Sequence, residues 1–425
     1  MKKISIATLI MLSAYASSAE AYNVADAIKA ARENNMQIKS KREDFKNAKT
    51  AKFQALTTVM PDVKATSGVG RAYLIPERGR LSNNDAAGIN LTVTQPIFDG
   101  FKTYYTYDKA KNSIGSAEFT YKANKDSILF EVIRTYEEVI RTREVYEVNV
   151  TTHQVLIKHL KETQERFKLG EATVTDVAQA ESRVAEALSN KTSAATEVSN
   201  AEALFFHVIG DRPLKELDPI EPEAVAIPTT LDELLDITLK QNPSLKKVDY
   251  DVKVAHNDKQ LAFTNFSPQV SATAAFNRSS LTASSAETKN NNSYSIGVNI
   301  PIFQSGTEYV RVKQAKISER KSKWDYEETT NAVKESTIKV WNEYIKNKAL
   351  LDSSNQAIAA TQSALAGVIE EAKVGTRTTL DVLDAEQDLF QAKIQYKNAH
   401  SNYIQALFAM HQLMGTIDKL PVLKS

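Results

Sequence analysis

Gln95-Pro96-Ile97-Phe98 recurs in this chain as Ile300-Pro301-Ile302-Phe303, about 205 residues further on, and this recurrence decides the fold. The chain has 425 residues, which is longer than a usual single domain. Further segments match in the same order: residues 34–39 with 241–246, 60–63 with 267–270, 168–170 with 373–375, 176–177 with 381–382, and 208–210 with 413–415. Because the matches keep their order along both halves, the sequence predicts a tandem duplication.

The duplication divides the chain into structural repeats at 22–210 and 231–415, a linker at 211–230 and a tail at 416–425. Proline removes a backbone donor and fixes φ, so a proline-rich linker is expected to be extended. The linker prolines are Pro213, Pro219, Pro222 and Pro228. Each repeat has the same order of patterns: helix, β-hairpin, very long helix, turn, helix. The predicted fold is mainly α with short β segments.

The longest helical pattern of each repeat has no proline before a Lys-x-Gly turn. It covers about residues 100–168 in the first repeat and about 306–373 in the second, with turns near Gly170 and Gly375. Some 65 residues of helix extend about 95 Å at 1.5 Å per residue. No ordinary globule buries such a helix, so its apolar stripe is expected to pack on neighbouring helices, with a shorter helix returning after each turn.

Each repeat also opens with a helical pattern, predicted at about 24–58 and at about 231–265. At the start of the long helices, Asp99 is a candidate N-cap in the first repeat. Ser305, with Glu308 three residues later, fits a capping box in the second.

Two stretches, at about 62–98 and 269–303, are expected to form β-hairpins. Apolar residues alternate with polar ones along them; the clearest are Ile89, Leu91, Val93, Tyr294, Ile296 and Val298. The polar segments 83–85 and 289–292 are expected to link the strands. A small soluble hairpin with one buried face fits this pattern, and so does a pair of strands that span a membrane.

The membrane alternative carries a physical constraint. A sheet in a bilayer cannot leave open edges, because its unpaired backbone groups would face hydrocarbon. Four strands cannot close a barrel, since about eight is the smallest number known. If the strands span a membrane, several chains must share one barrel.

The N-terminal residues 1–21 have the pattern of a cleaved signal peptide. Lys2 and Lys3 precede a short apolar core, and Ala19-Glu20-Ala21 supplies a small-x-small cleavage pattern. After Tyr22 no apolar stretch approaches the length of a spanning helix. The chain is therefore expected to be exported, and then either to be soluble outside the cytoplasm or to enter a membrane as a β-barrel.

Composition excludes several other classes of protein. Lys and Arg number 53 against 52 Asp and Glu, which argues against a nucleic-acid partner. The absence of cysteine excludes disulfides, thiolate metal sites, cysteine nucleophiles and a lipidated cysteine. The six histidines form no metal-binding pair at helical spacing, and no phosphate-binding loop or nucleophile elbow occurs. We expect neither enzymatic activity nor a cofactor.

The duplicated order of elements, the signal peptide and the paired Pro-Ile-Phe segments together resemble the TolC family. The segment 374–385, Val-Gly-Thr-Arg-Thr-Thr-Leu-Asp-Val-Leu-Asp-Ala, is similar to the inner-tip motif of that family. The resemblance implies a homotrimer with a twelve-stranded barrel shared in the outer membrane and a helical tunnel in the periplasm. It also implies a periplasmic adaptor, docked at the tips near Gly170 and Gly375, and an inner-membrane pump, either ABC-type or proton-driven.

Asp381 and Asp384 are the candidates for a pore constriction. Three residues apart on one helix, their carboxylates can face the same side, so a threefold assembly would carry two acidic rings that attract cations. Without the resemblance both would be taken as solvated helix acids. Asp388 extends the acidic face by one turn, whereas the first repeat has Gln179 at the position of Asp384.

The resemblance also implies links that hold the tip shut. Arg377 would form them, with Asp176 and Thr175 as partners; alternatively, Arg377 caps carbonyl groups of its own turn. Family members often have a tyrosine three residues before the tip glycine, and here that position is Ala372. One link is therefore missing.

The function expected from these features is a passive exit duct, gated at its periplasmic tip, for small molecules or secreted proteins. A soluble periplasmic coiled-coil rod or adaptor is the alternative. An envelope hydrolase has no supporting constellation of residues. The sequence identifies neither the cargo nor the particular adaptor and pump.

Overall fold

The computed structural model describes residues 22–74, 82–213, 216–222, 225–282 and 287–423, so the predicted signal peptide lies outside the described residues. The helices and strands follow in the order α1 (Val24–Asn34), α2 (Met36–Thr57), β1 (Asp62–Leu74), β2 (Ser82–Phe98), α3 (Lys102–Lys168), α4 (Val174–Ile209), α5 (Leu231–Gln241), α6 (Pro243–Thr264), β3 (Gln269–Thr282), β4 (Glu287–Asn299), α7 (Thr307–Lys373) and α8 (Thr379–Met414). Two 3₁₀ turns, Ile417–Lys419 and Pro421–Leu423, end the described chain.

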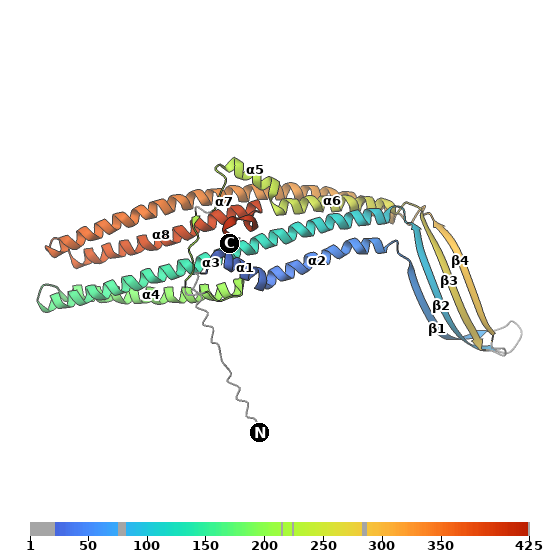
Figure 1. Ribbon diagram of the computed structural model, residues 1–425, viewed down its shortest axis with the longest axis horizontal. Coiled ribbons are helices and arrows are strands. Elements are labelled where there is room, and N and C mark those ends of the chain that lie inside the picture. The colour runs from blue at the N-terminus through green and yellow to red at the C-terminus, as the bar shows by residue number, and fades with distance from the viewer. Residues whose placement is uncertain (1–21, 75–81, 214–215, 223–224, 283–286, 424–425) are drawn as a thin grey trace, which may run out of the picture.

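The protein is an elongated rod (Figure 1). Its strands lie at one end, the turns between α3 and α4 and between α7 and α8 lie at the other, and α1 and α5 lie near the middle. The helices α3 and α7 have 67 residues each, about 100 Å at 1.5 Å per residue. The mainly α fold with duplicated order of elements is confirmed.

The opening helix of each repeat is broken, which corrects the expectation of one continuous helix. Asn35 separates α1 from α2, and Asn242 separates α5 from α6, both with extended ψ values (119° and 124°). The side chain of each asparagine caps the following helix and donates to a backbone carbonyl of a return helix, that of Val208 at 2.7 Å and of Leu413 at 2.8 Å. Asparagine favours a cap because its amide competes with helical hydrogen bonds.

The long helices begin differently from the predicted caps. Asp99 Oδ2 accepts from the backbone N–H of Thr103 at 2.7 Å, so this side chain does satisfy a first-turn donor. The capping box at Ser305 is wrong: Ser305 has φ 55°, and Glu308 Oε1 accepts from the backbone N–H of Gln304 instead. A left-handed residue before the helix turns the Ser305 side chain away from the capping geometry, which needs an extended residue.

The four strands form one antiparallel sheet in the order β1-β2-β3-β4. Residues 83–85 and 289–292, expected as links, instead pair within β2 and β4, opposite residues of β1 and β3. Polar residues can continue a strand when the neighbouring strand supplies backbone hydrogen-bond partners. Local strand propensity alone therefore does not set where a strand ends. The strands β2 and β4 therefore begin earlier than the sequence pattern indicated, whereas the hairpins as a whole have nearly the expected bounds.

The main hydrophobic core lies near the middle of the rod and contains residues of both repeats. Among its fully buried side chains are Ile28, Tyr136, Phe205 and Phe408. The Tyr136 hydroxyl donates to the backbone carbonyl of Tyr22 or Asp218, at 2.6 and 2.7 Å. The segment around Tyr22 and the linker are thereby attached to α3.

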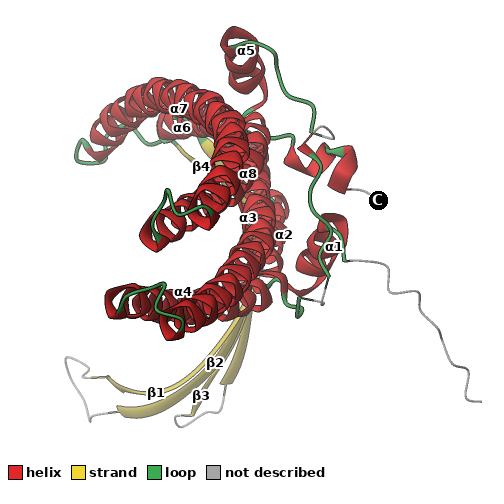
Figure 2. Ribbon diagram, turned by 90° about the vertical axis from the view of Figure 1, so that its left-hand side faces the viewer, coloured by secondary structure: helices red, strands yellow, loops and turns green. Residues whose placement is uncertain are grey.

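In the half of the rod that carries the sheet, the helices lie side by side in the order α7-α6-α3-α2. The junction between the two repeats is therefore the contact of α3 with α6, continued by that of β2 with β3. Seen from the tip end, the helices form a curved wall with α1 and α5 on its convex side (Figure 2). In this single chain, α2 and α7 are the outer helices of that half.

Candidate functional site

The tip of each repeat is a tight turn that exposes an apolar side chain. Gly170 and Gly375 have φ values of 78° and 79°, in the left-handed region that glycine adopts without steric cost. The residues before them, Leu169 and Val374, are each 75 % exposed. The two tips are thus alike in backbone and in apolar surface, as the duplication requires.

Asp176 and Asp381 hold equivalent places in the two tips, as the third residue of a return helix. Each carboxylate accepts from the backbone N–H and from the hydroxyl of the N-cap threonine, Thr173 or Thr378, at 2.8 Å. These backbone hydrogen bonds hold the pKa of both carboxyls below the usual range. Both acids therefore stay ionised and cap their own helices.

Asp384 has a different partner. Its Oδ1 accepts from Nη2 of Arg183 on α4 at 2.8 Å, across the space between the two helical hairpins. Asp381 and Asp384 are thus both near the tip of α8, but one carboxylate is turned to the helix end and the other to α4. Asp388, one turn further on, is exposed.

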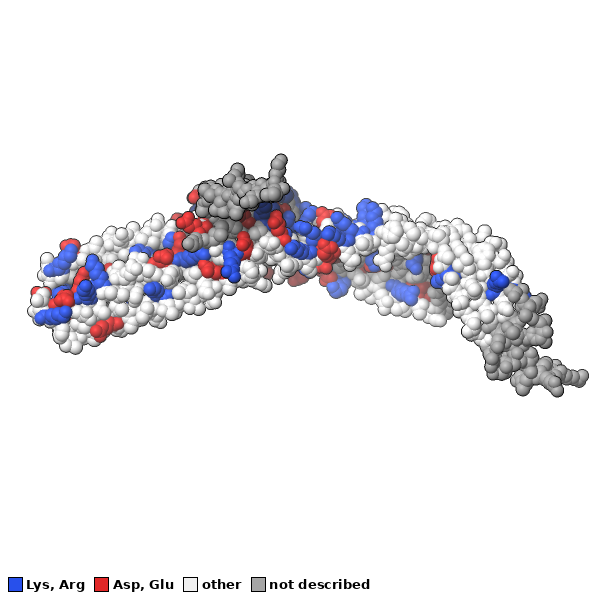
Figure 3. All heavy atoms as spheres, turned by 60° about the horizontal axis from the view of Figure 1, so that its bottom comes forward, with Lys and Arg blue, Asp and Glu red and all other residues white. Residues whose placement is uncertain are grey.

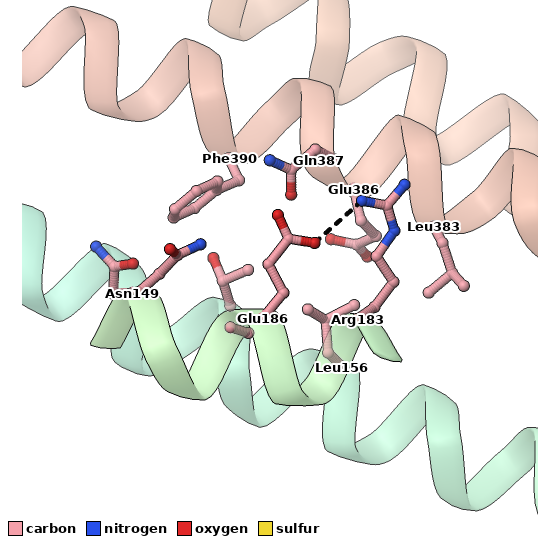
Figure 4. A pocket seen from close by; sticks show the side chains of 11 residues that line it. Asn149, Leu156, Arg183, Glu186, Leu383, Glu386, Gln387 and Phe390 are labelled. Atoms are coloured by element: carbon pink, nitrogen blue, oxygen red, sulfur yellow. Dashed lines mark hydrogen bonds and ion pairs between the residues drawn. The ribbon is translucent and has the colours of Figure 1, made fainter. Parts of the chain in front are cut away.

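Arg183 belongs to a seam between the hairpins in which polar side chains lie beside the apolar Leu383 and Phe390 (Figure 4). Arg183 Nη1 also donates to Glu186 Oε2 on its own helix at 3.2 Å. Glu386 and Gln387 of α8 line the same pocket as this pair. His159 of α3 lies 3.4 Å from Glu386. Sequence reasoning missed Arg183, because a pair 201 residues apart leaves no local spacing signal.

Arg377 is engaged within its own turn. Its Nε donates to Glu371 Oε2 at 2.8 Å, and the structure of one chain does not bring it to Asp176 or to Thr175, which is exposed. The expected Arg377 links to those residues stay a prediction. Ala372 lines a groove between the tips, at the position where a tyrosine was expected from the resemblance.

Neither a metal site nor a spanning helix occurs in the described part of the chain. Within those residues no group of three or more His, Cys, Asp or Glu side chains could hold a metal ion. None of the helices among them combines the length and the apolar character that crossing a bilayer requires.

A duplicated helical rod with a sheet at one end and paired turns at the other is the fold of outer-membrane channel proteins. A solved structure of CusC, described as forming a transmembrane channel, superposes with a TM-score of 0.81 at 15 % identity, over 92 % of this chain and 91 % of that one. The outer membrane protein VceC of Vibrio cholerae gives 0.78 at 17 % identity, over 92 % and 96 %.

The sequence assigns the chain within this class. The model of the outer membrane efflux protein family matches residues 27–210 and 234–416, so the chain belongs to that family. Among curated relatives, the outer membrane efflux protein BepC of Brucella suis is 26 % identical over 337 residues, 78 % of this chain and 73 % of that protein. The outer membrane protein TolC of Vibrio cholerae is 25 % identical over 421 residues, 97 % and 95 %.

Family membership confirms the resemblance to TolC and the outer-membrane location. The protein serves transport and is not an enzyme. The alternative of a soluble coiled-coil rod is thereby set aside.

Proposed function

We propose that this chain is one third of an outer-membrane exit duct, in which three copies share a twelve-stranded barrel and a helical tunnel for exported small molecules or proteins. The observation that carries the proposal is the four-stranded sheet at the end of the rod. Its outer strands, β1 and β4, each pair with one neighbour among the described strands. A bilayer does not tolerate such edges, and a barrel of several chains removes them.

The surface of the sheet supports its place in the membrane. Apolar side chains are exposed along its strands; these are Val63, Val69, Ile89, Tyr294, Ile296 and Val298. Charged groups are sparse at the strand end and denser along the helices on the face drawn in Figure 3. An outward-facing apolar band is what lipid requires of a barrel.

The tip end is proposed as the gate and constriction. Asp381 and Asp384 would supply acidic rings around a threefold axis, with the positive charge of Arg183 beside the second ring. Arg377 would link to Asp176 and Thr175 of an adjoining hairpin and hold the tip shut. Since Ala372 supplies no further polar link, Arg377 would contribute more to the stability of the closed tip.

The tips are also proposed as the contact for a periplasmic adaptor, through the turns at Gly170 and Gly375. The exposed Leu169 and Val374 beside them support this, because each gives its tip an apolar side chain that a partner could cover. An inner-membrane pump of the ABC or proton-driven type would supply the energy, since the sequence of this chain contains no phosphate-binding loop motif.

A flux measurement tests the duct. Purified full-length protein is reconstituted into sealed liposomes that hold a small hydrophilic dye, and dye release is compared with protein-free liposomes. We expect release that depends on the amount of inserted protein. A protein that stays soluble without detergent and leaves the liposomes sealed would contradict the proposal.

A further inference from the structure

The side chains on one face of the sheet are arranged in rows that cross the four strands. Successive residues of a strand point to opposite faces, so residues that pair across the ladder share a face. Val63 of β1, Val93 of β2 and Ala274 of β3 form one such row, which Tyr294 of β4 completes. The opposite face is polar, and one of its rows consists of Thr66, Asn90, Asn277 and Asn291. The face of Val63, which we call the apolar face, is the one that the proposed barrel turns to lipid.

One row of the apolar face contains a charge. It lies toward the end of the sheet away from the helices (Figure 1) and consists of Ser67, Ile89, Arg278 and Asn290. Arg278 is exposed, and it is the only charged residue of this face whose side chain the structure describes. Its guanidinium has no hydrogen bond or ion pair within the described part of the chain. A cation without a protein partner on a lipid-facing surface needs a counterion from its surroundings.

The depth of Arg278 follows from the aromatic residues at the other end of the sheet. Phe98, Phe101 and Phe303 are 37, 62 and 72 % exposed there. Membrane barrels have aromatic girdles of this kind at both edges of an apolar band about 25 Å tall. A bulge in β2 places Phe98 opposite Val270, so this girdle residue belongs to the apolar face.

The height from that girdle to Arg278 is close to the height of the band. Arg278 lies eight residues beyond Val270 along β3, about 27 Å at about 3.4 Å per residue. Strands of membrane barrels are tilted by about 35–45°, which leaves about 20 Å of height. The long side chain of an arginine extends further and carries its charge to the nearest polar layer. The guanidinium of Arg278 therefore reaches the second edge of the band, where lipid headgroups begin.

Arg278 also borders a groove on the apolar face. The groove has a volume of about 530 Å³, and Ser67, Ser280 and Ile89 are among the residues that line it. Ser280 lies two residues beyond Arg278 on the same strand and pairs with Ala87, whose methyl side chain fills little of the groove. The groove thus combines a cation and two hydroxyl groups with an apolar wall.

A phosphate group satisfies this set of donors. The guanidinium of an arginine presents its N–H groups in a planar fork that matches two oxygens of one phosphate, and hydroxyl groups supply further donors. A terminal phosphate is bound to its lipid through one oxygen only, so its other three oxygens are free for such contacts. A neutral headgroup would leave the charge of Arg278 without a counterion.

We propose that Arg278, with Ser67 and Ser280, binds the terminal phosphate of a lipid headgroup on the outer surface of the barrel. The lipid belongs to the leaflet away from the helices, and its acyl chains lie along the apolar rows of Ile89 and Leu91. The proposal rests on the barrel proposed above and names the class of lipid that its wall recognises.

Lipid binding measured by native mass spectrometry tests the site. Full-length protein in a neutral detergent is titrated with phosphatidic acid, which has a terminal phosphate, or with phosphatidylcholine, whose phosphate is covered by choline. We expect the native protein to bind phosphatidic acid about tenfold more tightly, because hydrogen bonds between charged groups are the strong ones. Arg278→Gln keeps a polar side chain and removes the charge, so it should bind both lipids alike.

Two controls separate the site from general charge and from free anions. Lys289→Gln removes an equal charge at nearly the same height on the opposite face, where Lys289 pairs with Ser279, and should leave the preference unchanged. Inorganic phosphate at the concentration of the lipid should not displace phosphatidic acid, because the apolar wall of the groove also holds the acyl chains. Loss of the preference in Lys289→Gln, or displacement by inorganic phosphate, would overturn the proposal.

The outcomes for the site and for the duct are distinguishable. No preference in the native protein, or an equal preference in Arg278→Gln, would overturn the lipid site, and dye release from liposomes by both proteins would leave the duct standing. A native protein that stays soluble without detergent and releases no dye would overturn the duct, and with it the membrane face on which this site lies.

Discussion

Arg183 and Asp384 join the two helical hairpins of one chain near the tip, with Arg183 Nη2 2.8 Å from Asp384 Oδ1. The pair has two consequences. It ties α4 to α8 at the end where the duct is proposed to open, and it places a positive charge beside Asp384, which belongs to one of the two proposed acidic rings. Because the arginine lies beside only one of the two aspartates, the two proposed rings would differ in field strength.

Removing that positive charge should strengthen the preference for cations. Arg183→Gln frees the Asp384 carboxylate, and we expect the permeability ratio of cations to anions to rise about two- to fivefold, because a narrow pore responds to single fixed charges. Reversal potentials in a salt gradient measure this ratio. Arg183→Lys, which keeps the charge, is the control, and an equal rise in both variants would count against the electrostatic cause.

The proposed gate link predicts a change in open probability. Arg377→Ala removes the contact with Glu371 and any contact with Asp176 or Thr175 of another hairpin, so the fraction of time spent in the open state should increase several-fold. Single-channel recording measures that fraction. Lys373→Ala, which removes an equal charge two residues before the tip glycine, is the control and should leave the open fraction unchanged. An unchanged open fraction in Arg377→Ala would show that Arg377 does not hold the gate shut.

The N-cap threonines should set the local stability of the tips. Thr378→Ala removes the hydroxyl that binds Asp381, and loss of an N-cap costs about 1 kcal/mol, or about fivefold faster hydrogen exchange in the first turn of α8. Thr173→Ala should have the same effect on α4. The neighbouring Thr379→Ala serves as the control, and exchange rates that do not differ between Thr378→Ala and Thr379→Ala would refute the role of the cap.

A buried carboxyl should make stability depend on pH. Glu137 is 2 % exposed, and burial, together with Glu144, raises its pKa to about 8 from 4.5. The folded state therefore holds a proton that the unfolded chain releases near pH 4.5. The stabilisation is complete below that pH and is lost as the pH rises through 8.

Between pH 5 and pH 8 the free energy of unfolding should therefore fall by roughly 3 kcal/mol per protomer from this group. Glu137→Gln should flatten this dependence, whereas the exposed Glu147→Gln should not. Helical circular dichroism followed through unfolding at several pH values checks the slope. A slope that Glu137→Gln leaves unchanged would assign the dependence to other groups.

The sequence predicted the large features because they rest on long patterns. The duplication, the two long helices and the tip glycines follow from periodicity and from the two Lys-x-Gly turns. The capping role of Asp176 and Asp381 was also readable from the spacing Thr173-x-x-Asp176 and Thr378-x-x-Asp381. The roles expected from the resemblance were a gate link for Asp176 and a pore constriction for Asp381.

Other features depend on contacts that sequence spacing does not encode. The helix break at Asn35 needs the carbonyl of Val208, which comes from the far end of the repeat. The extension of β2 through polar residues 83–85 needs the partner strand β1. Arg183 contacts Asp384 only because the fold places α4 beside α8.

The most direct test of the central claim is the current carried by single molecules in a planar bilayer, for the native protein and for Asp381→Asn with Asp384→Asn. Asparagine keeps the shape and the acceptor oxygen of each side chain and removes its charge. We expect small, cation-selective step currents from the native protein, and currents of similar occurrence with little selectivity from the variant. A native protein that inserts without passing current would contradict the duct, and equal selectivity in both proteins would move the constriction away from Asp381 and Asp384.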